Sequence, residues 1–466
     1  MLRDRYDEDP CFWAIIEQLA LEMEPELAQI DKILDDDELF QLIKKDLAQR
    51  HPQTLETGRN STPVEVGLRM LAVKRLYQFP YRETEWHVGD SLVLRWFCRV
   101  YFNPVPDYST LNRFARDIKP ETLHTFNERV TTIAQKLKVT RGRKLRTDGT
   151  VVETNIAYPR DSKLLNDGVR ILSRLLKQAK VLVQGTGQVV AETCRDRTRS
   201  ARNQARLIAN YARQRSTQAK AGLQKAYQRL VKTTQASVKQ AQTVLEVLQN
   251  QSSSTAVGMA EVLQTFIPRV EQALAQTVRR VFQGEQVPAP EKILSLFEPH
   301  TSLIRRGKAG KETEFGHKVW LDEVEGGIVT RWQVLEGNPP DTEQWQPAID
   351  HHLKQFEKPP HLASADRGVY SPDNEDYAHQ KGVKQVVLPK PGYKSPERRQ
   401  YEAQSWFKRG RRFQAGVEGR ISVGKRKHGL TCCLDHGEDG FDKWVGWGVI
   451  ANNLTVMGRT LATKTV

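Results

Sequence analysis

The sequence predicts an α/β protein whose mixed-sheet core is interrupted by a long helical insertion and preceded by an all-helical N-terminal module. Helix start signals and helical apolar periodicity fill residues 1–140, the expected DNA-binding or dimerisation module. β-forming residues then appear in 141–165 and resume in 312–466, the two expected parts of the core. Residues 166–311, rich in Ala, Gln, Arg and Lys, are the expected basic helical insertion.

Two start signals define helices in the N-terminal module. Residues 62–65 read Thr-Pro-Val-Glu, which predicts an N-cap threonine, a proline in the first helical position and a capping-box glutamate. Asp107 or Ser109 can cap a short helix that presents Arg113 and Arg116. A helix-turn-helix-like module and an ordinary helical bundle with surface arginines both remain open.

The insertion combines positive charge with a partial heptad. Residues 196–245 hold eleven Lys or Arg against one acid, Asp196. Apolar or small residues recur by steps of four and three from Tyr227 to Leu248, and residues 251–255 read as a turn. This pattern predicts a helical hairpin or a coiled-coil seam.

Strand and helix patterns alternate in the core. Residues 144–153 read as the first strand, and the insertion separates it from the rest. The expected later elements are a hairpin at 316–334, a helix at 342–356, a strand at 361–365, a helix at 374–380, a strand at 383–388, a helix at 413–426 and an apolar helix at 444–457.

Composition narrows the function classes. The formal net charge of +15 and a pI near 9.5 predict a polyanionic partner, nucleic acid ahead of a membrane surface, although a merely basic enzyme fits the charge too. No window holds the ~20 apolar residues of a membrane span, and the first ten residues carry four acids, which does not fit a secretory signal. Five scattered cysteines without a CxxC pair indicate a reducing compartment and no zinc site.

Three carboxylates are candidates for divalent-metal chemistry on DNA. Phosphodiester cleavage needs carboxylate-bound metal ions that activate the attacking oxygen and stabilise the leaving one. Asp148 lies in the first strand and is a better ligand candidate than Glu153, which points to the other face. Asp366 follows a short strand, and sites in open α/β sheets lie outside the carboxyl ends of strands. Glu418 lies on the expected helix at 413–426.

The helix of Glu418 also carries cations. Ser422 and Lys425 share its face, and Lys425 can reach the same phosphate. Arg411 would extend this face if the helix began early enough, but Gly410 and Gly416 argue against that.

Several other residues have two interpretations. A basic loop before the second core strand can grip phosphate or act as a solvated linker; its cations are Arg305, Arg306, Lys308 and Lys311. Trp406 and Phe407 among basic residues resemble a single-strand binding pattern, in which the tryptophan could stack on a flipped end base, but we favour a core tryptophan. His317 could orient a phosphate or pack in the sheet, and we favour packing. We expect the histidine pair at 351–352 to bind no metal, because it lacks an acidic or Cys partner at ligand spacing.

These residues resemble the DDE transposases of bacterial insertion sequences, which have a ribonuclease H-like catalytic domain. The segments that carry the resemblance are 109–114, 148–156 with 158–159 and 161–162, 307–311 with 314–319, 365–368 and 418–421. The resemblance implies that Asp148, Asp366 and Glu418 are the catalytic acids. It also implies Mg²⁺ as cofactor, replaceable by Mn²⁺, and transposon-end DNA as substrate. Lys425 fits the family's lysine, whereas Arg411 and Gln414 stand where relatives often have Tyr and Arg.

The sequence therefore predicts a DNA transposase that cleaves strands at transposon ends and transfers them into target DNA. Double-stranded DNA, both terminal inverted repeats and target, is the expected partner of a homodimer in the prokaryotic cytoplasm at the nucleoid. The rivals are a ribonuclease H-like nuclease or resolvase without joining activity and a non-catalytic architectural DNA-binding protein. The residues expected to contact DNA are Arg113, Arg116, Arg197, Arg199, Arg202, Arg206, Arg305, Arg306, Lys308, Lys311, Arg411, Arg412 and Arg420.

Overall fold

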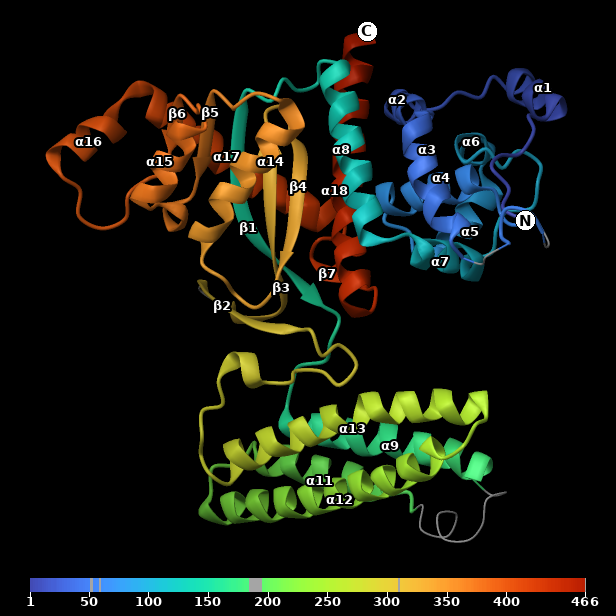
Figure 1. Ribbon diagram of the computed structural model, residues 1–466, viewed down its shortest axis with the longest axis vertical. Helices are drawn as coiled ribbons and strands as arrows, with labels where there is room; N and C mark the ends of the chain where they lie inside the picture. The colour runs from blue at the N-terminus through green and yellow to red at the C-terminus, as the bar shows by residue number, and fades with distance from the viewer. Residues whose placement is uncertain (51–52, 58–59, 184–194, 309–310, 466) are drawn as a thin grey trace. The chain divides into compact units, whose positions relative to one another are not determined.

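A computed structural model describes residues 1–50, 53–57, 60–183, 195–308 and 311–465, which form two compact units (Figure 1). Unit 1 consists of Met1–Glu153 and His317–Val466, and unit 2 consists of Thr154–Gly316. Unit 1 therefore contains the N-terminal helices and most of the sheet. In the sequence, unit 2 lies between the two segments of unit 1.

The first 140 residues of unit 1 form helices, as their capping signals predict. The helices are α1 (Pro10–Gln18), α2 (Pro25–Leu34), α3 (Asp37–Ala48), α4 (Val64–Leu76), α5 (Tyr81–Asp90), α6 (Leu92–Phe97), α7 (Tyr108–Asp117) and α8 (Pro120–Lys136). Asp107 caps α7 by accepting from Ser109 N and Thr110 N, which confirms that start signal. The predicted cap at Thr62 is wrong by one residue, because Pro63 has extended backbone angles and itself occupies the N-cap position.

Helix α4 is buried along almost its whole length and contains a buried arginine. Arg69 donates to Asp31, at 2.7 Å, and to the Phe97 carbonyl, at 3.1 Å, and it also pairs with Asp35 and Glu65. A buried guanidinium is tolerated only when carboxylates and carbonyls satisfy it, so these partners fix α2, α4 and α6 in one arrangement.

The sheet lies between helices on both faces. Its strands are β1 (Lys144–Thr154), β2 (Ser302–Lys308), β3 (Lys311–Val324), β4 (Ile328–Leu335), β5 (Leu362–Ala365), β6 (Gln385–Val387) and β7 (Cys432–Cys433). Within unit 1 the order is β4-β3-β1-β5-β6, and β7 pairs with β1. Strands β1, β5 and β6 are parallel neighbours, whereas β3 and β4 form the predicted antiparallel hairpin, which turns at Gly326 and Gly327 with positive φ angles.

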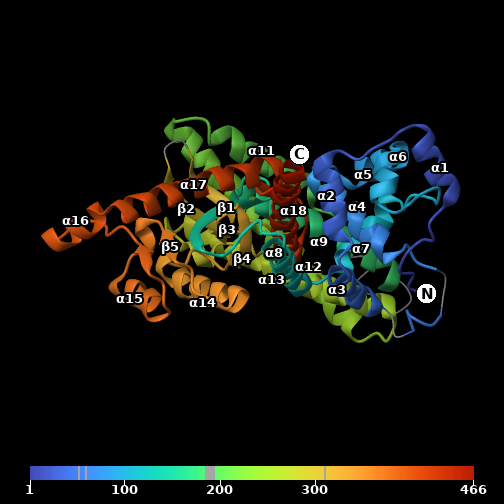
Figure 2. The ribbon, with the colours of Figure 1, turned by 90° about the horizontal axis from the view of Figure 1, so that it is seen from above.

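The helices that follow the hairpin cover the two faces of this sheet. They are α14 (Trp345–Phe356), α15 (Pro372–Gln380), α16 (Pro396–Ala403), α17 (Ser405–Lys427) and α18 (Gly437–Thr465), with short 3₁₀ turns η2 (Asp341–Gln344) and η3 (Arg367–Val369). Figure 2 shows α17 on one face of the strands and α14 on the other.

Helix α17 begins earlier than the sequence predicts. The expected start near residue 413 treated Gly410 and Gly416 as helix breakers. A Cβ atom on Gly410 would lie 2.5 Å from Val387 Cγ2, and one on Gly416 would lie 2.4 Å from Arg146 Nη1. These glycines therefore serve close packing of the helix against the sheet instead of ending it.

Two buried asparagines connect the N-terminal helices to the sheet. Asn127 on α8 donates to the carbonyls of Val329 and Thr330 on β4. Asn453 on α18 donates to Asn127 Oδ1 and accepts from Val329 N. The polar backbone of β4 is thus satisfied on this side by both helices, which run together along the sheet.

The described residues of unit 2 form a helical bundle with its own apolar core. Its helices there are α9 (Asp161–Val183), α11 (Thr198–Tyr211), α12 (Thr217–Gln249) and α13 (Ser254–Val281), followed by the turn η1 (Ala289–Glu291). The break between α12 and α13 confirms the turn predicted at 251–255. Thr234, the polar member of the predicted seam, is buried and donates to the Leu230 carbonyl, so its hydroxyl costs little in the core.

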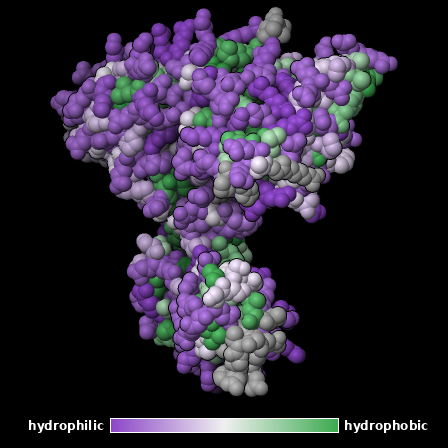
Figure 3. Space-filling view, turned by 45° about the vertical axis from the view of Figure 1, so that its right-hand side comes forward, coloured by the Kyte–Doolittle hydropathy of each residue, from purple (hydrophilic) through white to green (hydrophobic). Residues whose placement is uncertain are grey.

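Polar side chains dominate the molecular surface on the face drawn in Figure 3, where apolar residues form small, separate patches. None of the helices in the described part of the chain combines the length and apolar character that a membrane span requires.

A buried histidine gives the fold a pH dependence that can be measured. His352 on α14 is fully buried and stacks on Phe356, with 4.4 Å between ring centroids. Burial lowers the pKa of His352 to about 4. The folded state therefore favours the neutral ring. The resulting contribution to the free energy of unfolding is fully present above the unfolded pKa near 6.5 and is lost as the pH falls toward 4.

We expect the Tm of the wild-type protein to fall more steeply between pH 7 and pH 5 than the Tm of His352→Leu, because each unit of pKa difference is worth about 1.4 kcal/mol. The exposed His361→Leu is the matched control, and its Tm should follow the wild-type curve. Identical pH profiles for all three proteins would contradict the interpretation.

Candidate active site

Two of the predicted acids lie on neighbouring strands, Asp148 within β1 and Asp366 directly after the last residue of β5. In the parallel pairing of β1 with β5, Thr147 is opposite Ala365, so Asp148 and Asp366 are the next residues on the two strands. Asp366 keeps an extended backbone, with φ −68° and ψ 163°. Adjacent strands are about 4.8 Å apart and paired residues point to the same face. The two carboxylates therefore leave the same face of the sheet, beside the carboxyl end of β5.

Helix α17 brings the third acid to this face. Gln414 Oε1 accepts a hydrogen bond from Ser364 Oγ at 3.0 Å, and Gln414 Nε2 donates to the Thr147 carbonyl at 3.1 Å. Glu418 follows one helical turn later. Four helical residues rise about 6 Å and two strand residues about 6.6 Å, so Glu418 advances along the helix as far as Asp366 advances beyond Ser364. Glu418 thus lies over the strand end that carries Asp366.

A cavity of about 520 Å³ opens at this strand end. Asp366 and Glu418 line it together with four basic residues: Arg367, Lys390, Lys394 and Arg411. Arg411 lies two turns before Glu418 on the same helix, so the face that the sequence left in doubt is continuous. Acids and cations that line one cavity suit the binding of a phosphate bridged by a metal ion.

The electrostatics of Asp366 reflect crowding of negative charge. Its carboxyl is exposed at the cavity, yet the surrounding walls desolvate it and raise its pKa, and the charges of Glu418 and Asp341 raise it further. Arg367 opposes the shift. A raised carboxyl pKa at like-charged neighbours indicates that a cation at this point would relieve the repulsion.

Asp341, which the sequence analysis did not select, is a fourth acid near Asp366. It pairs with Lys318, whose ammonium also donates to the Pro339 carbonyl at 2.9 Å. Its Oδ2 lies 3.1 Å from where a Cβ atom on Gly368 would be. The glycine two residues after Asp366 therefore lets η2 approach the strand end.

The loop at 389–395, directly after β6, contributes the basic wall that the sequence analysis missed. Glu402 holds this loop: it accepts from Lys390 N at 3.0 Å, from Lys394 Nζ at 2.5 Å and from Arg398 Nε at 3.0 Å. Burial opposes ionisation of Glu402, but these hydrogen bonds keep its pKa below the usual value. Tyr393 at the tip of the loop is 81% exposed. The rule that sites lie beyond the carboxyl ends of strands would have identified this loop.

The carboxylate set fits Mg²⁺ by chemistry, because Mg²⁺ prefers oxygen ligands. Within the described ranges, however, no three His, Cys, Asp or Glu side chains are close enough to hold one ion together. Mg²⁺ is commonly bound through one or two carboxylates with water and substrate phosphate as further ligands. The arrangement therefore suits an ion shared between protein and DNA better than a closed protein cage.

Other predicted residues of α17 have different surroundings. Arg420 donates to Glu323 Oε1 at 3.3 Å and to Asn452 Oδ1 at 3.2 Å, so it faces away from Glu418. Lys425 lies about two turns beyond Glu418 and does not line the cavity. Arg412 is exposed beside Arg411.

The aromatic residues at the start of α17 pack in the protein. Phe407 is fully buried against Leu362 and Val387. Trp406 is half-buried and meets Phe407 edge-on, with 5.6 Å between ring centroids. This packing favours the core interpretation of Trp406 over base stacking. His317 is buried and meets Phe441 edge-on, as predicted for a packing role.

The remaining predicted DNA contacts lie on separate elements. Arg113 and Arg116 are exposed on α7. On α11 of unit 2, Arg199, Arg202 and Arg206 are exposed, whereas Arg197 is half-buried and donates to Gln240. Arg305 is exposed on β2. The side chains of Arg306, Lys308 and Lys311 lie outside the described part of the structure.

One comparison with known proteins gives a match. Residues 16–117, from the end of α1 to the end of α7, match the family model of a transposase domain, DUF772. No curated protein and no solved structure matches the chain. The match includes Arg113 and Arg116 and leaves Asp148, Asp366 and Glu418 outside. The N-terminal helices of unit 1 therefore suggest a transposase.

Proposed function

We propose that the protein is a DDE-type DNA transposase in which Asp148, Asp366 and Glu418 bind Mg²⁺ where α17 packs over β1 and the carboxyl end of β5. The observation that carries the proposal is the meeting of three elements. Parallel pairing makes Asp148 and Asp366 neighbours, and α17 carries Glu418 over the same strand end. The transposase-domain match in the N-terminal helices supports the same class of activity from a separate part of the chain.

The sheet also supports a ribonuclease H-like core. An antiparallel hairpin, β3 with β4, lies beside the parallel set β1, β5 and β6, and helices cover both faces. This is the mixed α/β arrangement that the resemblance implies. The acids come from the central pair of strands and from a helix packed on them, where small shifts of the surface leave their spacing unchanged.

The chemistry would begin with cleavage at a transposon end. Bound Mg²⁺ would polarise the scissile phosphate and lower the pKa of the attacking water. Arg411 and Lys390 would hold the neighbouring backbone phosphates, because both line the cavity beside the acids. Hydrolysis breaks the bond between phosphorus and the 3′ oxygen and frees a 3′-OH.

Transfer to target DNA repeats the displacement with a different nucleophile. The freed 3′-OH attacks a target phosphodiester, a new P–O bond forms, and the target's own 3′ oxygen leaves with a proton. One bond replaces another of the same kind, so no external energy source is required. The same carboxylates and cations can therefore serve both steps.

Neutralising any one of the three acids should abolish catalysis. We expect Asp148→Asn, Asp366→Asn and Glu418→Gln each to reduce Mg²⁺-dependent cleavage of terminal-repeat DNA by more than about 100-fold, as when a main electrostatic contact to the reacting group is lost. DNA affinity, measured by fluorescence anisotropy, should change little. The exposed Glu336→Gln is the matched control and should cleave normally.

Product mapping with pre-cut terminal repeats and a circular target then separates joining from cleavage. Transfer products that need the same three acids support the transposase assignment. Cleavage without any joined product would instead identify a nuclease, and near-wild-type cleavage by one variant would remove that residue from the ligand set.

We further propose that unit 2 binds the DNA backbone through α11. Arg199, Arg202 and Arg206 recur at helical spacing, are exposed and form a single face. Charged helices that face phosphate bind with strong salt dependence and little sequence preference. The alternative is a solvated helical bundle that acts only as a spacer.

Neutralising that face should flatten the salt dependence of binding. For the triple variant Arg199→Gln, Arg202→Gln and Arg206→Gln, we expect the slope of log affinity against log salt to fall by up to about 2.7, or 0.9 for each lost phosphate contact. The choice of end sequence should stay the same, because phosphate contacts carry no direct sequence information. A matched triple, Lys136→Gln, Lys138→Gln and Lys358→Gln, removes the same charge from exposed positions in unit 1. Equal slopes for the two triples would rule out the DNA-binding role of α11.

A further inference from the structure

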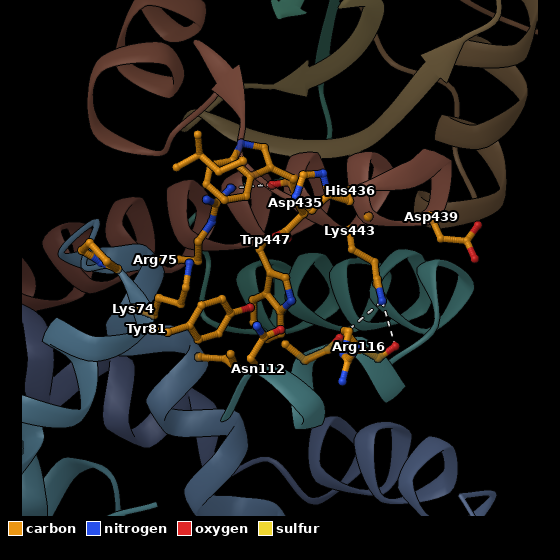
Figure 4. Close-up of a pocket in the computed structure, with 16 residues that line it drawn as sticks. Lys74, Arg75, Tyr81, Asn112, Arg116, Asp435, His436, Asp439, Lys443 and Trp447 are labelled. Carbon is orange, nitrogen blue, oxygen red and sulfur yellow. Dashed lines mark hydrogen bonds between the residues drawn. The ribbon is translucent and has the colours of Figure 1, made fainter. Parts of the chain in front are cut away.

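A second cavity, of about 690 Å³, lies within unit 1 and apart from the acids (Figure 4). One wall comes from α4, α5 and α7, which belong to the part of the chain that matches a transposase domain. The other wall comes from Leu434–Asp435 and the first half of α18. Pockets that bind small organic ligands have this size.

Two buried cations form the floor of the cavity. Lys74 is 8% exposed and Arg75 is 7% exposed. Within the described ranges, the Lys74 ammonium makes no hydrogen bond and no ion pair; it lies 4.5 Å from the centroid of the Tyr81 ring and 5.3 Å from that of Trp444. Arg75 stacks on Trp444 at 4.0 Å and donates to its carbonyl, but its buried Nε has no acceptor among the described residues.

The charges of the cavity do not cancel. Four cations line it, and the two acids that line it are Asp435 and Asp439. In Figure 4 the carboxylate of Asp439 points away from the other labelled side chains. The Lys443 ammonium already donates hydrogen bonds to the carbonyls of Ala115 and Arg116. Asp435 alone therefore faces both Lys74 and Arg75, and the floor keeps a net positive charge.

The burial of Lys74 disfavours the charged form of its ammonium group. Desolvation, and to a smaller extent the charge of Arg75, lower the pKa of the Lys74 ammonium to about 8, although Asp435 acts in the opposite direction. An anion in the cavity would restore the charged form, because an opposite charge at short range compensates for lost hydration.

Aromatic side chains form the walls above this floor. Tyr81 is half-buried, and Trp444 and Trp447 face the cavity from α18. In Figure 4 Tyr81 extends from the left and Trp447 from above toward the same region, with Asn112 below them. A simple anion would contact only Lys74 and Arg75, whereas a planar ligand with a phosphate would contact both these cations and the aromatic rings.

We propose that this cavity binds a nucleotide, with the phosphate against Lys74 and Arg75 and the base against Tyr81 and Trp447. Aromatic rings stack on any nucleobase, and Asn112 offers a donor and an acceptor for its edge. A free nucleoside monophosphate and the 5′-phosphorylated end of a DNA strand share this chemistry. The inference goes beyond the proposed catalysis and does not depend on it.

Calorimetric titration of the full-length protein tests the proposal with three probes: dAMP, a 5′-phosphorylated trinucleotide and orthophosphate. We expect Lys74→Met, which keeps the length of the apolar stem, to weaken dAMP and trinucleotide binding at least tenfold. The exposed Lys136→Met is the charge-matched control and should bind like the wild type. Tyr81→Leu should weaken dAMP binding but leave orthophosphate binding unchanged, because only the base uses the ring.

The probes also distinguish the two sources of the nucleotide. Trinucleotide binding at least tenfold tighter than dAMP binding identifies a DNA strand end, and equal affinities identify a free nucleotide. The Tyr81→Leu comparison stands even if Lys74→Met does not fold. The proposal is overturned if no probe binds saturably, if Lys74→Met and Lys136→Met bind alike, or if Tyr81→Leu leaves dAMP affinity unchanged.

Discussion

Close packing of α17 on the parallel pair β1 and β5 is the constraint on which the candidate active site depends. Glycine at positions 410 and 416 lets the helix approach Val387 and Arg146 at distances that no Cβ atom permits. Gln414 then joins the two strands by accepting from Ser364 and donating to the Thr147 carbonyl. One turn later the helix can only place Glu418 over the strand ends.

Two acids of unit 1, Glu323 and Asp366, differ in their partners. Glu323 is buried and pairs with Arg146 at 2.7 Å and with Arg420 at 3.3 Å, so it stabilises the sheet beneath α17. Asp366 instead has like-charged neighbours, and its pKa is raised. A buried carboxylate that stabilises the fold pairs with a basic side chain of the protein, whereas a carboxylate that takes part in catalysis can bind a cation from solution. This difference in partners supports the proposed catalytic role of Asp366.

The sequence predicted elements with strong local signals and missed features that depend on tertiary contact. The hairpin, the short strand before Asp366 and the turn between α12 and α13 followed from periodicity and turn residues. The early start of α17 did not, because Gly410 and Gly416 break isolated helices and reveal their packing role only against the sheet. The acids were proposed from a resemblance, but Asp341 and the basic loop around Lys390 join Asp366 only through the fold.

Metal binding tests the central proposal most directly, since the proposal is that the carboxylates of Asp148, Asp366 and Glu418 help to bind a divalent cation. A Mn²⁺ titration of the full-length protein, followed by electron paramagnetic resonance, measures that binding without requiring a DNA substrate. The account predicts saturable Mn²⁺ binding that the double variant Asp148→Asn and Asp366→Asn weakens at least tenfold, while the exposed Glu336→Gln has no effect. Unchanged affinity and stoichiometry in the double variant would contradict it.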